Sequence, residues 1–227
     1  MIGVKEVLAS CPMLAGFPEC AFDELTAMAR VNRFRTGEPI YEGGSMQSSL
    51  SVIARGSVRL TSVNPAGREA TLMLFEEGSW FGDSVFSPGM PRVYSVTAHE
   101  DTELVELPGD KLRALMASYP ASYPVALDLV SRRLLAALTT LEDDALRSVP
   151  VRIGRRLLLL AELQKSGESA NVTLKLTREQ IANLMGMTRQ GVHKSLKDFE
   201  EEGLLEFSYG QVTITDPAAL KEFVESQ

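Results

Sequence analysis

Five polar side chains recur along one face of a predicted helix near the C-terminal end of the chain. They are Arg189, Gln190, His193, Lys194 and Lys197. Arginine, lysine and glutamine can bond to the edges of DNA bases, and cationic side chains also neutralise phosphates. We interpret His193 as a contact to phosphate or water rather than as a metal ligand, because the other histidine, His99, is far away in the sequence. The set therefore favours recognition of nucleic acid.

Two short helices must position this face. Thr177 and Gln180 form a Thr-x-x-Gln capping box, which starts the first helix at Thr177 and places Arg178 in its first turn. Gly186 ends that helix, and Thr188 caps the second. The inward-facing apolar residues of the second helix are Val192, Leu196 and Phe199. This arrangement predicts a helix-turn-helix, and Thr177, Arg178 and Thr188 join the candidate DNA-binding residues.

The segment after these helices predicts a β-hairpin wing over residues 204–215, with its turn at Tyr209 and Gly210. A capped helix pair with a polar outer face also occurs in proteins that bind no DNA, so this alternative stays open on the pattern alone. The second helix carries three cations on its polar face against the single acid Asp198, which favours DNA.

The net charge of -7 argues against a nucleic-acid partner, but its distribution weakens that objection. Residues 1–146 carry 12 Lys and Arg against 19 Asp and Glu, whereas residues 147–227 carry 11 against 11. The excess negative charge therefore lies in the first part of the chain. A neutral module can still bind DNA if its cations gather on one face.

The first part of the chain predicts an antiparallel sandwich or barrel. Residues 20–30 read as a short helix, and residues 31–107 consist of short β-prone runs separated by turn residues such as Gly56, Gly67 and Gly78. Residues 109–118 predict another short helix. Cys11 and Cys20 are expected to be buried thiols or thiols without a function, since two thiols without a nearby histidine make a weak metal site.

A long helix is predicted over residues 122–145. Leu127, Leu134 and Leu141 recur at seven-residue spacing, with Leu138 and Ala145 on the adjoining seam. This pattern is typical of a short coiled coil and indicates dimerisation, although so few heptads also suit a helix packed on the β domain of a monomer. A break at residues 143–150 is expected to form the hinge. A basic helix over 151–165, a polar turn over 167–171 and a strand over 172–176 follow.

Several classes of protein are disfavoured. No run approaches the roughly 18 apolar residues of a membrane span, and the N-terminus lacks a secretion pattern, so a cytoplasmic protein without a membrane partner is expected. We find no Gly-rich phosphate loop, serine nucleophile motif or His-Glu metal cluster, so no enzyme is expected. An iron-sulfur cluster needs about four cysteine ligands, and the chain has two.

Over nearly its full length the chain resembles the CRP/FNR family of bacterial transcription regulators. The features that carry this resemblance are the glycine-punctuated β region with Gly-Ser-Trp-Phe-Gly-Asp at 78–83, Arg-Arg-Leu at 132–134, and the helix-turn-helix at 176–205. The resemblance implies an α+β fold with three parts. These are a jelly-roll-like β-roll sensor (1–118), a central dimerisation helix and hinge (119–147), and a winged helix-turn-helix (148–227) that controls RNA polymerase at promoters.

The same resemblance implies an effector site in the β-roll. Family members that bind cyclic nucleotides hold the ribose with a Gly-Glu pair and the phosphate with an Arg-Ser pair. The matching residues here are Gly82, Asp83, Arg92 and Val93, and the helix adds Arg133, Ala137 and Leu138. Val93 cannot donate the missing hydrogen bond, and Ala137 and Leu138 offer no polar group to adenine. Another small ligand is therefore favoured over cyclic AMP, and a haem-type signal or no ligand also stays open.

The resemblance also implies how DNA is read. Family members begin the second helix with an Arg-Glu-x-x-x-Arg set, which corresponds here to Arg189, Gln190 and Lys194. A homodimer is then expected to present two such helices to a palindromic operator. The alternative is a cyclic-nucleotide-binding module that acts on a partner protein without touching DNA.

Overall fold

The computed structural model describes residues 3–46, 48–67, 69–164 and 171–226. The chain divides into two compact units. The first comprises Met1–Ser62 and Leu72–Ala136, and the second comprises Val63–Thr71 and Ala137–Gln227. Within the described ranges, no helix is both long and apolar enough to cross a membrane.

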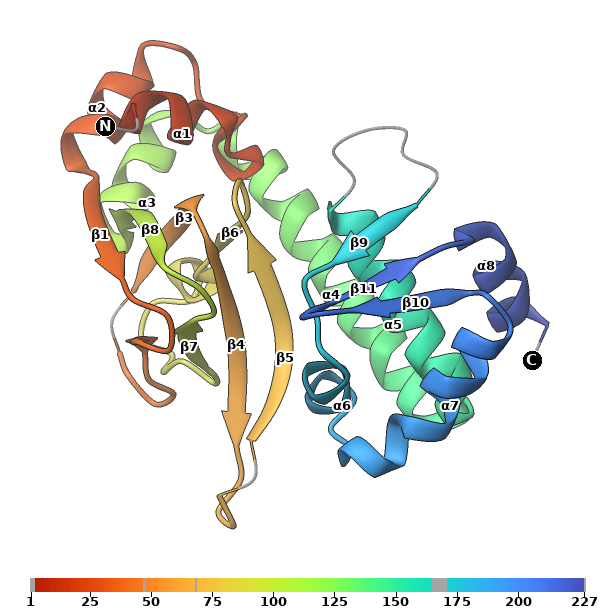
Figure 1. The fold of residues 1–227 in the computed structure, drawn as a ribbon. Helices are drawn as coiled ribbons and strands as arrows, with labels where there is room; N and C mark the ends of the chain where they lie inside the picture. The colour runs from red at the N-terminus through yellow and green to blue at the C-terminus, as the bar shows by residue number, and fades with distance from the viewer. Residues whose placement is uncertain (1–2, 47, 68, 165–170, 227) are drawn as a thin grey trace. The chain divides into compact units, whose positions relative to one another are not determined.

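The first unit is built on two four-stranded sheets (Figure 1). One sheet has the order β1 (Arg30–Phe34), β8 (Thr102–Pro108), β3 (Ser49–Arg55) and β6 (Trp80–Phe81). The other has the order β2 (Pro39–Tyr41), β7 (Ser95–Ala98), β4 (Ser57–Val63) and β5 (Glu69–Glu76). Neighbouring strands pair antiparallel, as in β1 with β8 and β4 with β7. The predicted antiparallel β-roll is therefore confirmed.

Alternate residues of the strands face two different cores. Ile53 and Leu104 point into a cluster shared with Leu60 and Val96 of the other sheet, and this cluster fills the interior of the roll. Val52, next to Ile53, joins a second cluster on the outer face of the first sheet. Period-two alternation explains this division, because successive strand side chains lie on opposite faces.

Short helices cover that outer face. They are α1 (Val4–Ser10), the 3-10 turn η1 (Pro12–Leu14), α2 (Ala21–Met28) and α3 (Gly109–Ser118). The prediction of a helix at 20–30 is confirmed, but it ends earlier because Arg30 already belongs to β1. A second 3-10 turn, η2 (Asp83–Phe86), follows β6. The helix α1 was not predicted, because its seven residues are too few to establish a helical period.

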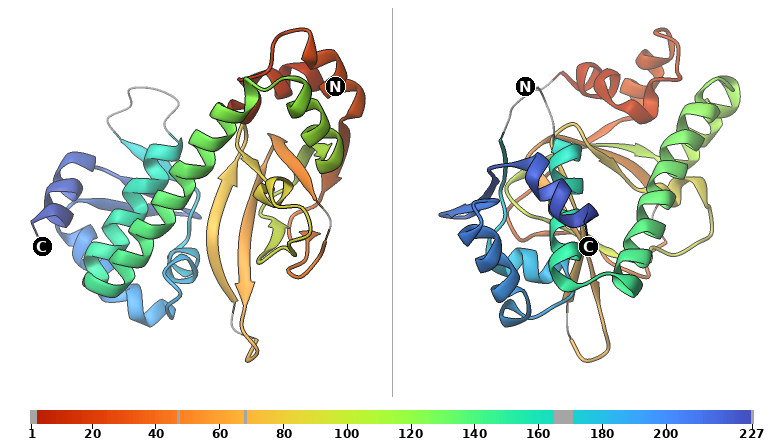
Figure 2. Two further views of the ribbon diagram at one scale, coloured as in Figure 1. Left: turned by 180° about the vertical axis from the view of Figure 1, so that it is seen from behind. Right: turned by 90° about the vertical axis from the view of Figure 1, so that its right-hand side faces the viewer.

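The long helix α4 spans Ser122–Leu146 without interruption, as Figure 2 shows. The predicted helix is confirmed, whereas the break predicted over residues 143–150 is narrower than expected. Only Arg147 and Ser148 separate α4 from α5 (Val149–Gln164). Asp143 and Asp144 stay in the helix because Arg155 and Arg152 of α5 pair with their carboxylates, at 2.9 Å and 2.6 Å.

The second unit contains the predicted helix pair and hairpin. After α5 come β9 (Val172–Leu174), α6 (Arg178–Leu184), α7 (Arg189–Glu201), β10 (Leu205–Ser208), β11 (Gln211–Ile214) and α8 (Pro217–Glu225). The three strands form one antiparallel sheet in the order β10, β11, β9, which confirms the wing. The strand predicted to 176 ends at Leu174. Lys165 and most of the polar turn predicted at 167–171 lie outside the described residues.

Gly82 provides a test of the β-roll geometry. Its φ is 106°, and a Cβ there would overlap the carbonyl oxygen of Ser49. Because left-handed strain and overpacking add, Gly82→Ala is expected to lower the free energy of unfolding by about 2 to 5 kcal/mol in urea titrations. Gly89→Ala is the control, because φ is 88° there but a Cβ would meet nothing within 4 Å. If the free energy of unfolding fell by the same small amount in both variants, Gly82 would not lie as close to the Ser49 carbonyl as described.

Candidate nucleic-acid interface and effector site

The capping box at the start of α6 has the predicted geometry. The Thr177 hydroxyl accepts a hydrogen bond from the Gln180 backbone N–H at 3.2 Å. In return, the Thr177 N–H donates to Oε1 of Gln180 at 2.7 Å. Two backbone donors that the helix leaves unpaired are thereby satisfied. The side chain of Thr177 is therefore engaged in starting the helix.

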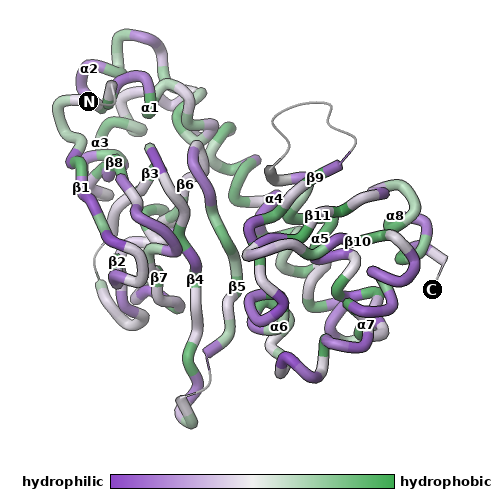
Figure 3. The backbone as a smooth tube through the Cα atoms, in the orientation of Figure 1, coloured by the Kyte–Doolittle hydropathy of each residue, from purple (hydrophilic) through white to green (hydrophobic). Residues whose placement is uncertain are grey.

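The recognition helix α7 separates its polar and apolar side chains as predicted. Thr188 caps it by accepting a hydrogen bond from the Gly191 N–H at 3.1 Å. Val192, Leu196 and Phe199 are buried. All five residues of the predicted polar face are exposed: Arg189, Gln190, His193, Lys194 and Lys197. Figure 3 shows mainly hydrophilic residues along this helix.

Lys197 has an acidic neighbour on the same helix. Its Nζ lies 3.0 Å from Oε1 of Glu201, one turn further along the helix. The hydrogen bond from Lys197 to Glu201, together with the negative charge, raises the pKa of Lys197. A phosphate that binds Lys197 must compete with this carboxylate.

Arg178 is held within the second unit rather than extended into solvent. Its guanidinium pairs with Glu200 of α7 and lies 3.8 Å from the centre of the Phe207 ring on β10. One side chain thus connects α6, α7 and the wing. These contacts of Arg178 were not predicted, because Glu200 and Phe207 are distant from it in the sequence.

In the first unit, Arg92 is buried, with 4% of its surface exposed. Its guanidinium carbon lies 3.6 Å from the centre of the Tyr41 ring. Its backbone is fixed by hydrogen bonds with Ser45 and Gly44, at 3.0 Å and 2.7 Å. Val93, the next residue, is 79% exposed. Arg92 is thus buried in the first unit, and Val93 beside it is exposed to solvent.

Asp83 and Arg133 form an ion pair between η2 and α4. Nη1 of Arg133 donates to both carboxylate oxygens of Asp83, at 2.8 Å and 3.0 Å. Its Nη2 donates to the Trp80 carbonyl at 2.6 Å, and the guanidinium lies 3.4 Å from the centre of the Trp80 ring. Arg133 therefore occupies part of the hydrogen-bonding capacity that Asp83 offers to a ligand.

Tyr94 shows that these charged groups lie near one another. Burial raises the pKa of Tyr94, the negative charge of Asp83 raises it further, and the positive charges of Arg133 and Arg92 oppose the shift. Four of the predicted effector residues thus gather in the first unit: Gly82, Asp83, Arg92 and Arg133. Ala137 and Leu138, in contrast, are exposed residues of α4 that belong to the second unit.

A buried hydrogen-bond network beside Arg92 was not anticipated. The Tyr41 hydroxyl meets Ser49 and Ser51, each at 2.7 Å, and donates to Glu106 of β8. Burial and the charge of Glu106 raise the pKa of Tyr41 to about 12. The network keeps the ring in place beneath Arg92. No local motif marks it, because its members come from three strands.

The predicted dimer seam is exposed in the single chain. Leu127, Leu134, Leu138 and Leu141 are between 52% and 67% exposed. Figure 3 shows hydrophobic residues repeating along α4. The face of α4 that packs on the first unit instead carries Ala126. The four leucines are therefore not buried against the β domain of the same chain.

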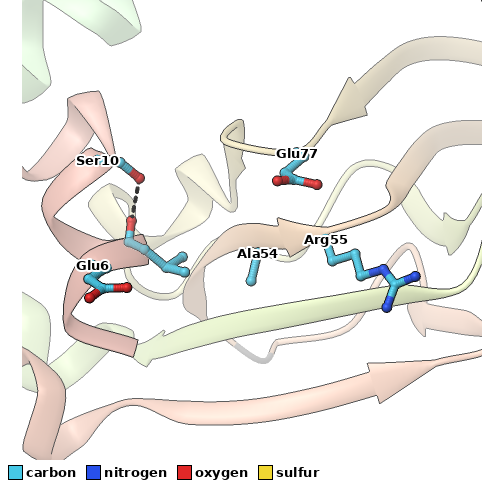
Figure 4. Close-up of a pocket in the computed structure, with 6 residues that line it drawn as sticks. Glu6, Ser10, Ala54, Arg55 and Glu77 are labelled. Carbon is cyan, nitrogen blue, oxygen red and sulfur yellow. Dashed lines mark hydrogen bonds between the residues drawn. The ribbon is translucent and has the colours of Figure 1, made fainter. Parts of the chain in front are cut away.

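A separate hollow of about 410 Å³ lies on the first unit between α1, the end of β3 and Glu77 (Figure 4). Its lining includes the carboxylates of Glu6 and Glu77, while the Ser10 hydroxyl donates to the Val7 carbonyl at 2.9 Å. None of the predicted effector residues lines it. The hollow is therefore distinct from the cluster around Arg92.

Comparisons with known proteins agree with this geometry. Residues 31–119 match the family of cyclic nucleotide-binding domains, and residues 151–223 match the Crp-like helix-turn-helix domain. A CRP-like cAMP-activated global transcriptional regulator of Mycobacterium tuberculosis is 32% identical over 220 residues, which cover 96% of this chain and 98% of that protein. A cyclic AMP receptor protein of Thermus thermophilus is 29% identical over 186 residues, covering 82% of this chain and 84% of that one.

A solved structure gives the same result. The crystal structure of a CRP/FNR-family transcriptional regulator from Thermus thermophilus is similar with a TM-score of 0.66 at 28% identity, covering 86% of this chain and 98% of that one. The fold and the exposed face of α7 define a winged-helix, DNA-binding transcription regulator with a cyclic-nucleotide-binding-type β-roll. The chain belongs to the CRP/FNR family, which confirms the resemblance stated from its sequence.

Proposed function

We propose that the chain works as a homodimer that reads a palindromic operator with one α7 from each subunit. The observation that carries this proposal is the exposed polar face of α7, with Arg189 and Gln190 in its first turn. Two such helices suit half-sites about one helical turn, or ~34 Å, apart. Its site of action is the bacterial cytoplasm, where DNA lies, and RNA polymerase is its partner at promoters.

The side chains of α7 have different roles in this proposal. Arg189 bonds bidentately to O6 and N7 of a guanine, the commonest specific contact in the major groove. Gln190 suits N7 and N6 of adenine, because its amide both donates and accepts. Lys194 is a point charge that serves a guanine or a phosphate with less discrimination than an arginine. Lys197 contacts phosphate, His193 contacts phosphate or water, and Thr177, Arg178 and Thr188 support the helices at the interface.

The effector in this proposal is a small anion bound by Arg92 inside the roll. A buried guanidinium stacked on Tyr41 presents a fixed fork of donors to a phosphate or carboxylate. The relatives from Mycobacterium tuberculosis and Thermus thermophilus are named for cyclic AMP. This chain departs from a cyclic AMP site at Val93, which offers no hydrogen bond, and at Asp83, which is shared with Arg133. We therefore propose weak binding of cyclic AMP and a different natural effector.

The alternative function, a module that acts on a partner protein without binding DNA, is disfavoured. The match to the Crp-like helix-turn-helix domain covers residues 151–223 and includes α6 and α7. An exposed cationic face on α7 is expected in a module that binds DNA and is not needed in one that binds only a partner protein.

The dimer seam predicts the effect of charge on α4. Leu134→Glu combined with Leu141→Glu is expected to yield monomers in sedimentation velocity, because each buried leucine contributes roughly 1.5 to 3 kcal/mol. Leu146→Glu is the matched control. It is 74% exposed on the same helix but lies about 110° around the axis from the mean direction of the seam, at 100° per residue. A dimer that persisted in the double variant would place the interface elsewhere.

The base-reading role of Gln190 predicts a change of operator. In a selection from random duplex DNA, Gln190→Glu is expected to change the preferred base at one symmetric pair of positions, because a glutamate accepts from cytosine N4. Lys197→Ala is the control: it is expected to recover the parent motif and to reduce the salt slope of binding by about one. Recovery of the parent motif by Gln190→Glu as well would remove Gln190 from the base-reading set.

The proposed effector site predicts a gain of function. Calorimetry with cyclic AMP is expected to show weak binding to the parent protein and roughly tenfold tighter binding to Val93→Ser, because the new hydroxyl can donate to an anionic phosphate. Arg92→Ala is expected to abolish binding, at a cost of roughly 2 to 5 kcal/mol. Tight binding by the parent that survives Arg92→Ala would show that the ligand lies elsewhere.

A further inference from the structure

The loop before β3 places a serine opposite Arg92. The Gly44 N–H donates to the Arg92 carbonyl at 2.7 Å, and the Arg92 N–H donates to the Ser45 carbonyl at 3.0 Å. Because φ of Gly44 is 83°, these two hydrogen bonds form a β-bulge with a left-handed glycine in its first position. Ser45, the second residue of the bulge, is thereby opposed to Arg92. Residues opposed in this way have neighbouring side chains on the same face of an antiparallel pair.

The hydroxyl of Ser45 is buried and unused. Its Oγ is shielded from solvent and has no hydrogen-bond partner within the described ranges of the chain. A buried hydroxyl without a partner lowers stability, and such groups are rare in native proteins. The hydroxyls of Ser48 and Ser84 share this property, but Ser45 is the one of the three whose backbone is hydrogen-bonded to Arg92. Its position therefore points to a ligand that Arg92 also binds.

The tyrosine beneath Arg92 does not provide a hydroxyl to such a ligand. The ring of Tyr41 lies 3.6 Å from the guanidinium carbon, while its hydroxyl donates to Glu106 and so uses its single proton. Val93, which follows Arg92 along the chain, has no polar group in its side chain and is 79% exposed. Ser45 is therefore the neutral donor that remains on the segment opposite Arg92.

A guanidinium and a hydroxyl together suit an oxyanion. The guanidinium donates through a planar fork, and the oxygens of a phosphate or carboxylate have lone pairs left for a further donor. A hydroxyl that donates to an anion forms a charge-assisted hydrogen bond, which is stronger than a bond between neutral groups. Arg92 is 4% exposed, so such a bond lies in a buried site of low dielectric constant, where hydrogen bonds strengthen further.

We infer that the hydroxyl of Ser45 donates to the anionic group of the effector beside the guanidinium of Arg92. The inference rests on the proposed anion site and adds a residue to it. Ser45 reaches the ligand from the segment before β3, whereas Arg92 and Val93 lie on the segment before β7. Binding then supplies the hydrogen-bond acceptor that folding does not provide.

Thermal-shift titrations with cyclic AMP, carried to millimolar concentrations, test this role, because Tm without ligand reports stability and its rise with ligand reports affinity. Ser45→Ala is expected to weaken binding of cyclic AMP roughly tenfold, since one hydrogen bond to a charged group is lost. Ser45→Thr keeps the hydroxyl and is expected to bind like the parent. Without ligand, the Tm of Ser45→Ala is expected to equal or exceed that of the parent, because alanine removes an unsatisfied buried hydroxyl.

Ser48→Ala is the matched control. The Ser48 hydroxyl is also buried without a hydrogen-bond partner among the described residues. Its carbonyl, however, accepts a hydrogen bond from the Gly109 N–H at 3.0 Å, which places Ser48 at the start of α3. Ser48→Ala is therefore expected to bind cyclic AMP like the parent.

The two phosphorothioate diastereomers of cyclic AMP locate the contact on the phosphate. In each of them sulfur, a weaker hydrogen-bond acceptor, replaces one exocyclic oxygen. One diastereomer is expected to bind the parent less tightly than cyclic AMP does. The same replacement is expected to cost Ser45→Ala little further affinity, because the hydrogen bond that sulfur weakens is already absent.

The role of Ser45 is overturned if Ser45→Ala binds cyclic AMP like the parent, if it lowers Tm without ligand, or if Ser48→Ala loses as much affinity. It is also overturned if sulfur has the same effect on Ser45→Ala as on the parent with both diastereomers. A parent protein whose Tm does not respond to cyclic AMP, or responds equally after Arg92→Ala, would instead remove the proposed anion site and this inference with it. The Arg92→Ala measurement thus separates the two failures.

Discussion

The guanidinium of Arg133 anchors one side of α4 to Trp80 and Asp83 of the first unit. It stacks 3.4 Å from the Trp80 ring and holds both carboxylate oxygens of Asp83, so this side of the helix turns toward the roll together with Ala126. The leucine seam lies about 110° away around the axis, at 100° per residue, and is therefore presented to solvent. The same contact occupies an acidic group of the effector cluster. The exposure of the predicted dimer seam and the hydrogen bonding of Asp83 are thus linked through Arg133.

The cationic and acidic side chains of α7 lie in different parts of the helix. The recognition helix keeps Arg189 and Lys194 in its exposed first turns, while acidic residues gather after them at Glu200 and Glu201. Glu200 is used by Arg178, and Glu201 by Lys197. The cations near the N-terminal end of α7 therefore dominate the surface presented to a polyanion. An acidic chain can in this way bind DNA through a local field of opposite sign.

Features that depend on short-range patterns were predictable from the sequence. Thr177 and Gln180 are three residues apart, so their capping box can be read directly, and the seven-residue spacing of leucines marked α4. The stacking of Arg92 on Tyr41 was not predictable, because the two residues are separated by 51 positions and meet only once β2 and β7 pair. The short helix α8 was missed although Asp216 and Pro217 form an N-terminal signal, with Asp216 capping Ala219 at 2.9 Å.

The junction of α4 and α5 has a mechanical consequence. Two connecting residues supply about four soft dihedral angles, enough for a free swivel if nothing else joined the helices. Two ion pairs cross the junction, from Arg155 to Asp143 and from Arg152 to Asp144. The aspartates are neighbours on α4, and the arginines lie three residues apart on α5, so the two pairs join the helices at two separate points. Rotation of α5 about the end of α4 therefore requires both ion pairs to break, which favours one relative orientation of the two helices.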